Sequence, residues 1–204
     1  MDAKEHYDLL IVENNDPVRD PPPLREYMEK YDGAPFLEAL ELSPEKTALE
    51  IGIGTGRLAQ KTAPRCRRLV GIDFSPKTIG RAKENLARFP NIEYICGDFL
   101  THSFGERFDV IYSSLTLMHF SDKQAFISKA ASLMKRDAVL CLSLEKSRQE
   151  YIDFGSRRIR VYPDSAENIE RCMRDVHLRC VHRFETELAE IVVGKREDGD
   201  ESAD

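Results

Sequence analysis

The residues of this chain most suited to ligand chemistry lie in a glycine-rich turn. Residues 48–57 read ALEIGIGTGR, a β-rich run followed by the turn and the start of a helix. Gly52, Gly54 and Gly56 would let the backbone pass close to a ligand that a Cβ would exclude. Arg57 stands where a dinucleotide-binding fingerprint requires its third glycine. The turn therefore predicts a site for a nucleotide-like cofactor and disfavours a diphosphate.

Three carboxylates accompany this turn. Glu50 precedes the first glycine by two residues, Asp73 ends the second β-rich run, and Asp98 follows the third. Glu50 would repel a diphosphate and attract an ammonium group. Ligands of open α/β sheets bind at the carboxyl ends of the strands, so we expect the three acids to face one crevice. The alternative is that Asp73 and Asp98 only begin turns, as aspartates often do.

The strands that position these residues alternate with helical segments, which is typical of a parallel sheet with crossover helices. We expect parallel strands over 47–51, 68–73, 92–96, 108–113 and 138–144, then two strands over about 178–186 and 188–195. The last two are joined so closely that they must be antiparallel. The pattern predicts an α/β fold with a doubly wound, Rossmann-like, seven-stranded, mostly parallel sheet and an antiparallel C-terminal hairpin.

Helical periodicity predicts the crossovers. We expect a short helix over 56–63 and a longer one that Ser75 caps. A third begins at Ser121 and buries Phe126, Ala130, Leu133 and Met134, and a fourth opens at Asp164 or Ser165 with Ile169, Cys172, Met173 and Val176 on its apolar face.

The chain divides into three segments. Residues 1–45 carry two short helical patterns and are expected to pack on the sheet as a helical flap. Residues 46–196 hold the α/β pattern. Residues 197–204 contain five acids and are expected to be a disordered acidic tail.

Composition limits the class of protein. The net charge of the 204 residues is -6, but residues 1–196 hold 31 acids against 30 bases. A nearly neutral body lacks the basic field of a general nucleic-acid binder. The five cysteines form no C-x-x-C pair, which favours buried thiols in a reducing compartment. With no signal peptide and no long apolar run, we expect a cytoplasmic protein without membrane association.

With the glycine turn and the acids in this order, residues 46 to 195 resemble the class I S-adenosylmethionine-dependent methyltransferases. The resemblance implies that Glu50 and the turn hold the methionine part of S-adenosylmethionine and that Asp73 accepts both ribose hydroxyls. It implies that Asp98 accepts from the adenine amino group. The remaining implied contacts are Phe74 and Phe99 on either side of the adenine, and the backbone of Ser113 and Ser114 near the ammonium end.

No dedicated catalytic residue is required, because the cofactor is already activated and the protein mainly aligns the two reactants. His119 is a weak candidate for a general base, and a packed histidine is the more common case. No Cys/His spacing suggests a metal, so none is assigned. The segment after residue 145 is either a solvated loop with an edge strand or a pocket for an acidic or aromatic acceptor; it holds Arg148, Tyr151, Phe154, Arg157, Arg158, Arg160 and Tyr162.

We expect a methyltransferase that acts on a small-molecule acceptor. The chain shows no appended recognition domain, no basic face and no Asn/Asp-Pro-Pro-Tyr motif after the fourth strand, where Ser113 and Ser114 stand instead. Two alternatives stay open. One is an NAD(P)-dependent oxidoreductase, and the other is a cofactor-binding partner subunit without turnover. The sequence does not indicate the oligomeric state.

Overall fold

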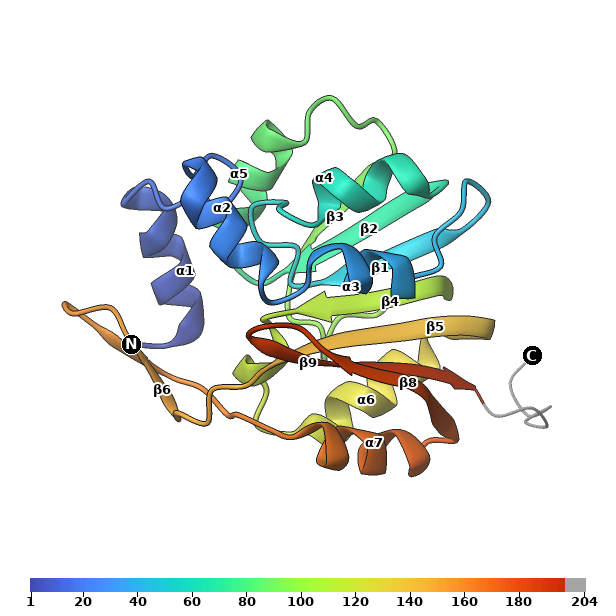
Figure 1. Cartoon of the computed structure of the whole chain (residues 1–204). Helices are drawn as coiled ribbons and strands as arrows, with labels where there is room; N and C mark the ends of the chain where they lie inside the picture. Colours follow the sequence, from blue (N-terminus) through green and yellow to red (C-terminus); the bar gives the residue numbers. More distant parts are fainter. Residues whose placement is uncertain (197–204) are drawn as a thin grey trace.

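A seven-stranded sheet forms the middle layer of the molecule (Figure 1). The structure is a computed structural model, and it describes residues 1–196. The order of the strands is β3-β2-β1-β4-β5-β9-β8. Their bounds are β1 (Thr47–Ile51), β2 (Arg68–Asp73), β3 (Ile92–Cys96), β4 (Phe108–Ser114), β5 (Met134–Glu145), β8 (Leu178–Glu185) and β9 (Ala189–Arg196).

The pairing confirms the predicted fold class. Strands β1 to β5 pair in parallel, β9 is antiparallel to β5, and β8 is antiparallel to β9. The predicted acidic tail, residues 197–204, lies outside the described residues.

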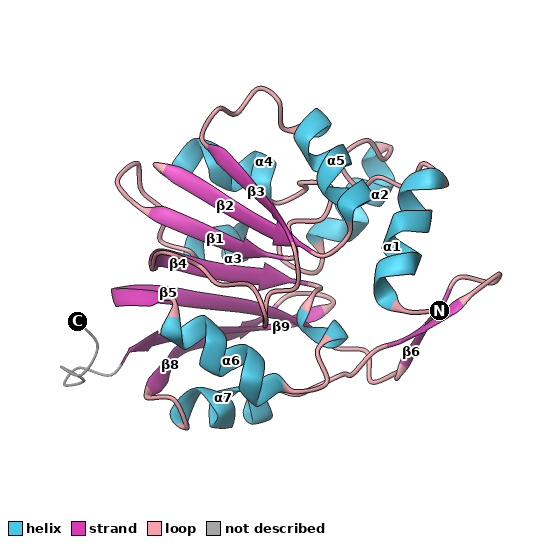
Figure 2. Cartoon of the chain, turned by 180° about the vertical axis from the view of Figure 1, so that it is seen from behind, coloured by secondary structure: helices cyan, strands magenta, loops and turns pink. Residues whose placement is uncertain are grey.

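Helices cover both faces of the sheet (Figure 2). One face packs against α3 (Gly33–Ala39), α4 (Ala59–Thr62) and α5 (Pro76–Asn85), and the other against α6 (Lys123–Ser132) and α7 (Ala166–Arg174). Ser75 caps α5 by accepting from the Thr78 amide at 3.1 Å, and Ser165 caps α7 by accepting from the Asn168 amide at 3.2 Å. These caps satisfy amides that a helix leaves without a partner in its first turn.

Some boundaries differ from the prediction. Met134 was expected in the third helix, but α6 ends at Ser132 and Met134 begins β5, where it pairs with Phe108. Met134 is fully buried, as it would be in either a core-facing helix or a strand, so its hydrophobicity alone could not assign it to one element. Cys96 is exposed, contrary to the expectation of buried thiols, because it ends the edge strand β3.

The N-terminal segment contains three helices rather than two. Besides α2 (Pro22–Glu29) and α3 it forms α1 (Ala3–Val12), which was not predicted. Helix α1 packs on α5, and the Asp8 carboxylate accepts from the Ser75 hydroxyl at 2.7 Å. The segment after β5 forms a separate two-stranded hairpin of β6 (Tyr151–Asp153) and β7 (Arg158–Arg160), which reaches the same helix.

None of the helices within residues 1–196 is long and apolar enough to cross a bilayer. Over the same residues, no group of three or more His, Cys, Asp or Glu side chains is arranged so that it could hold a metal ion.

Candidate active site

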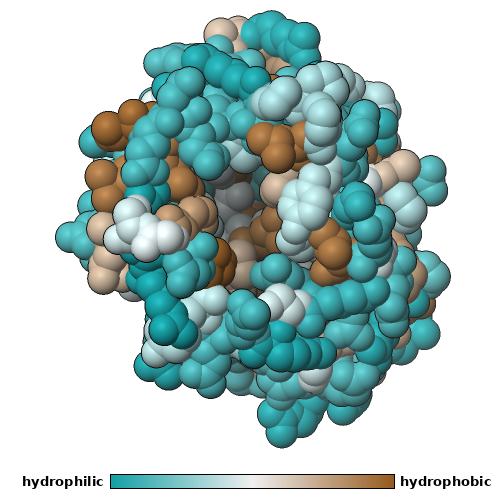
Figure 3. Space-filling model, turned by 60° about the vertical axis from the view of Figure 1, so that its left-hand side comes forward, coloured by the Kyte–Doolittle hydropathy of each residue, from teal (hydrophilic) through white to brown (hydrophobic). Residues whose placement is uncertain are grey.

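A crevice with a cavity volume of ≈ 190 Å³ opens at the carboxyl ends of β1, β2 and β4. In Figure 3, which brings the α1 side forward, the surface is hollowed near its middle and hydrophobic side chains lie around the hollow. The lining comes from the glycine turn, the ends of β2 and β4, and α1: Tyr7, Leu10, Ile11, Asn15, Pro17, Met28, Glu50, Gly52, Ile53, Gly54, Thr55, Arg57, Leu58, Asp73, Phe74, Thr78, Ser114, Leu115, Thr116 and His119.

Glu50 is the buried acid of this crevice. Its side chain is 3% exposed, and Oε2 accepts from the Tyr112 hydroxyl at 2.8 Å. Burial raises the pKa of Glu50 to about 8, although the Tyr112 bond and the positive charge of Arg57 oppose this rise. A bound cation would favour the charged form, so the site is suited to a positively charged group.

Asp73 is the second acid and lies at the end of β2. Its Oδ2 accepts from the Gly54 amide at 3.1 Å, and its Oδ1 accepts from the Ser75 amide at 3.0 Å. Burial raises the pKa of Asp73, and these backbone donors act in the opposite direction. The carboxylate thus ties the glycine turn to the next strand while its remaining lone pairs face the crevice.

The three glycines of the turn have different reasons to be glycine. All have positive φ: 77° at Gly52, 57° at Gly54 and 98° at Gly56. A Cβ on Gly52 would come within 2.2 Å of the Thr116 side chain, and one on Gly56 within 2.6 Å of Leu86. A Cβ on Gly54 would meet nothing within 4 Å, since this residue borders the open crevice. Gly54 is therefore the glycine past which a ligand has room to lie.

Arg57, in place of the third fingerprint glycine, forms an ion pair with Asp32 of the N-terminal segment. The two guanidinium nitrogens donate to both carboxylate oxygens, and Asp32 is fully buried. Asp32 also accepts from the Ser114 hydroxyl at 2.8 Å. Glu50 and Arg57 thus place a carboxyl group that a bound cation would ionise and a positive charge in the lining of the crevice.

Helix α1 forms a roof over the crevice. The Tyr7 hydroxyl bonds the Nε2 of His119 at 2.8 Å, and the Tyr7 ring meets Phe74 edge-on with centroids 6.0 Å apart. Burial lowers the pKa of His119 to about 4, so the imidazole is neutral at pH 7 and able to accept from Tyr7. His119, the weak candidate for a general base, is thus hydrogen-bonded to the roof.

The β6–β7 hairpin holds the other side of α1. The Nε of Arg157 donates to the Nδ1 of His6 at 2.9 Å, and its two terminal nitrogens donate to Glu13 at 2.5 Å each. Phe154 packs on the buried His6 ring with centroids 4.3 Å apart. Arg157 therefore anchors the roof and is not presented to a ligand.

Not every predicted site residue reaches the crevice: the lining does not include Gly56, Asp98, Phe99 or Ser113. Asp98 is exposed, and its Oδ1 accepts from the amides of Leu100 and Thr101 at 2.7 and 3.3 Å. Phe99 is 3% exposed and packs in the hydrophobic core against other phenylalanines. Ser113 is buried, with its hydroxyl donating to the Ile51 carbonyl at 2.9 Å.

Those that reach it are Glu50, Gly52, Gly54, Asp73, Phe74, Ser114 and His119. Sequence reasoning gave no role to Thr78 or to the apolar side chains Leu10 and Ile11, which also line the crevice. The alternation of charged and apolar residues over 3–12 was the available signal for α1.

Comparison with known proteins identifies the central region. Residues 49–142 match a family model described as a methyltransferase domain. Residues 49–142 thus belong to a methyltransferase domain. This methyltransferase domain contains the glycine turn, Asp73 and the end of β4, which form most of the crevice. The match favours methyl transfer over the oxidoreductase alternative.

Two curated relatives illustrate the range of proteins that are similar to this chain. A probable ribosomal RNA small subunit methyltransferase A from Methanosarcina acetivorans is 38% identical over 77 residues, which cover 38% of this chain and 28% of the relative. Nodulation protein S from Sinorhizobium fredii is 30% identical over 96 residues, covering 47% of this chain and 44% of the relative. The matched segments thus span less than half of the length of these relatives.

Two solved structures resemble the whole methyltransferase fold. The N-methyltransferase NodS from Bradyrhizobium japonicum WM9, in complex with S-adenosylhomocysteine, has a TM-score of 0.71 at 21% identity and covers 96% of this chain and 98% of that one. The complex of DhpI with S-adenosylhomocysteine has a TM-score of 0.74 at 16% identity and covers 95% of both chains. At these identities the likeness concerns the fold.

Proposed function

We propose that this protein transfers a methyl group from S-adenosylmethionine to a small-molecule acceptor. The observation that carries the proposal is the crevice itself, in which the Glu50 and Asp73 carboxylates face one space beside the open Gly54. This space lies at the carboxyl ends of adjacent parallel strands, where α/β folds bind ligands.

The residues of the crevice fit the cofactor. Glu50 and Arg57 offer opposite charges to the ammonium and carboxylate of an amino-acid end. The lone pairs of Asp73 that the backbone leaves free suit the ribose hydroxyls, and Phe74 offers an aromatic ring beside them. When bound, the cofactor supplies an activated methyl group. The chain holds both reactants in line and, with α1 as the roof, limits access of water.

A small acceptor is supported by the position of α1 over the crevice. Tyr7, Leu10 and Ile11 of α1 cover the crevice, and the β6–β7 hairpin anchors that helix. An RNA acceptor is the second candidate, because a relative that shares 38% identity is a probable ribosomal RNA methyltransferase. The nearly balanced charge of residues 1–196 gives that candidate little electrostatic support.

The test is transfer of radiolabel from S-adenosylmethionine to fractions of a cell extract. One fraction contains molecules below about 1 kDa, and the other contains RNA. We expect label and S-adenosylhomocysteine to appear with the small molecules. Label in RNA alone would overturn the acceptor class. Binding of S-adenosylhomocysteine without label in any fraction would support the partner-subunit alternative.

A further inference from the structure

A second, smaller cavity opens beside the crevice at the carboxyl end of β5. Its volume is ≈ 20 Å³, which accommodates about one water-sized group. Leu115 and Thr116 line both cavities, so the two cavities adjoin at these residues. The other lining residues are Leu117, Met118, Lys123, Ser143, Leu144, Glu145, Ser147, Gln149, Val161, Tyr162, Pro163 and Asp164. The size and position suit a single polar group held next to the crevice.

One of the two shared residues, Leu115, has an unusual backbone conformation. Leu115 has φ 55°, the left-handed region that side chains with a Cβ rarely adopt. Such conformations collect at ligand sites because the surrounding structure must hold them in place. Leu115 directly follows Ser114 of β4, so the strained residue lies where the strand meets both cavities.

Glu145 is the acid of the small cavity. It is the last residue of β5 and is half-buried. The Tyr31 hydroxyl donates to its Oε1 over a long distance of 3.5 Å. Burial raises the pKa of Glu145. Within residues 1–196, no lysine, arginine or histidine forms an ion pair with this carboxylate. Its charge also acts on Tyr7, which faces the crevice.

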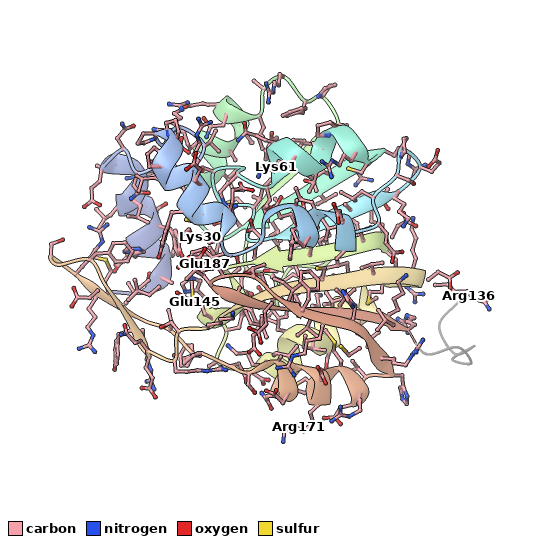
Figure 4. All side chains as sticks on the ribbon, viewed as in Figure 1. Lys30, Lys61, Arg136, Glu145, Arg171 and Glu187 are labelled. Atoms are coloured by element: carbon pink, nitrogen blue, oxygen red, sulfur yellow. The ribbon has the colours of Figure 1, made fainter. Side chains whose placement is uncertain are left out.

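The nearby cations are engaged elsewhere. The Lys123 ammonium donates to the carbonyls of Leu117, Phe120 and Tyr162 at 2.9, 2.6 and 2.6 Å. Lys30 pairs with Glu187 at 2.7 Å; Figure 4 shows this pair and Glu145 at the same end of the molecule, with Arg136 at the opposite end. Lys146, next to Glu145 in the chain, pairs with Glu185 at 2.9 Å. Glu145 is thus a carboxylate that lacks a counterion and borders a space of the size of one polar group.

We propose that the small cavity binds the amino group of the methyl acceptor and that Glu145 recognises it as an ammonium ion. This inference rests on the proposed function, and it names the acceptor as a small primary amine. A charged amine would supply the missing partner of Glu145 and form a charge-assisted hydrogen bond. A carboxylate acceptor would be repelled, and a neutral hydroxyl would leave the carboxylate without a counterion.

The same carboxylate completes the proton balance. The ammonium first gives one proton to Glu145, whose raised pKa makes it a better acceptor than an ordinary glutamate. The free lone pair of the nitrogen then attacks the methyl carbon. A C–N bond forms as the C–S bond breaks, and the electron pair of the broken bond stays on sulfur. The product is a secondary ammonium ion, and the proton on Glu145 passes to water.

Binding without turnover tests this site directly. The protein, labelled with 13C at the glutamate δ-carbons and saturated with S-adenosylhomocysteine, is titrated with ethanolamine and benzylamine. Ethylene glycol and benzyl alcohol are the matched hydroxyl probes. The Glu145 resonance is assigned by its absence from Glu145→Gln. We expect it to shift with the amines, with affinity at least about tenfold higher than for the alcohols.

Two variants sharpen the test. Glu145→Gln keeps the shape and is expected to lose amine binding at least about tenfold while it retains affinity for S-adenosylhomocysteine. Glu185→Gln, an exposed partner of Lys146, is the control and should bind amines as the wild type does. Equal binding of amines and alcohols by the wild type, an unchanged Glu145→Gln, or no amine-dependent shift would overturn the proposal. Failure to bind S-adenosylhomocysteine at all would instead count against the proposed function.

Discussion

The floor and the roof of the crevice are built in opposite ways. The floor consists of the residues at the carboxyl ends of β1 and β2, namely Glu50, Gly52, Gly54 and Asp73. They lie within 24 positions of one another, on strands paired in register from Thr47–Arg68 to Ile51–Ile72. The roof is α1, which the β6–β7 hairpin holds in place. Its contacts join residues far apart in the sequence, such as Tyr7 with His119 and Glu13 with Arg157.

This contrast indicates how the two parts behave. The floor is fixed by backbone hydrogen bonds between parallel strands, so it is present before a ligand arrives. The roof is attached through side chains, and regions of this kind open locally at a lower free energy than the core of a sheet. We therefore expect substitutions in the floor to change the affinity for the cofactor. Substitutions in the roof should change the rate at which the cofactor dissociates.

The largest effect is expected from Asp73→Ala. It removes a carboxylate that can accept two charge-assisted hydrogen bonds, each worth about 1.5–3 kcal/mol, so affinity for S-adenosylhomocysteine should fall more than about 100-fold. Calorimetric titration measures this, and circular dichroism checks the fold. Asp98→Ala is the matched comparison. Because Asp98 lies outside the crevice lining, this variant should lose less than about tenfold in affinity for S-adenosylhomocysteine. Equal losses for both variants would contradict the account of the floor.

The glycine turn offers the next largest effect, on stability. Gly52→Ala places a Cβ against Thr116 in a left-handed conformation and should lower the free energy of unfolding by roughly 2–4 kcal/mol. Gly54→Ala has the same backbone strain but open space, so about 1–2 kcal/mol is expected. Urea denaturation of both variants measures the difference. A larger loss of stability in Gly54→Ala than in Gly52→Ala would be inconsistent with the structure.

Glu50→Gln should weaken cofactor binding about tenfold and change the pH dependence of stability. The folded pKa of Glu50, about 8, lies above its ordinary value of 4.5, so the folded state keeps a proton that the unfolded state has lost. The stability contributed by protonated Glu50 is full below pH 4.5 and is lost as the pH rises through about 8.

Glutamine removes this dependence. The stability of ligand-free Glu50→Gln relative to the wild type should therefore be higher at pH 9 than at pH 5. Thermal denaturation at the two pH values is the measurement, and a constant difference would show that Glu50 does not titrate in this range.

The smallest effect is expected in the roof. Tyr7→Phe keeps the ring on Phe74 and removes the hydrogen bond to His119, worth about 0.5–1.5 kcal/mol. S-adenosylhomocysteine should dissociate roughly three to ten times faster, with faster amide exchange over residues 3–12. Stopped-flow displacement measures the rate. Tyr27→Phe, in the same segment but outside the crevice lining, is the control. An unchanged dissociation rate would show that the roof does not control release of the cofactor from the crevice.

The same contrast explains what the sequence could predict. Glu50 and Asp73 line the crevice as predicted because each lies at the carboxyl end of its own strand, and parallel strands end at one edge. Phe99 was expected beside the cofactor, but its large apolar ring is buried in the core with Phe126. A position after a strand does not determine which way a side chain turns.

The roof could not be predicted in the same way. Helix α1 has only a shallow apolar stripe, and it is held by partners more than 60 positions away, including Ser75 and Arg157. The arginines and aromatics after β5 left open either a solvated loop or an acceptor pocket. Arg157 binds α1, Arg158 and Arg160 lie over Tyr151 and Tyr162, and Tyr162 also lines the second cavity. Only the fold reveals that Glu145, which carried no motif, borders the second cavity.

The central claim is that the floor of the crevice binds S-adenosylmethionine. The most direct measurement is calorimetric titration of the purified protein with S-adenosylmethionine, S-adenosylhomocysteine and NADH in parallel. We predict that both sulfur compounds bind with one-to-one stoichiometry and that NADH does not bind. Arg57 stands in place of the third glycine of a dinucleotide-binding fingerprint, and Glu50 would repel a diphosphate. Binding of NADH alone would contradict the account and make Asp73 the ribose ligand of a dinucleotide.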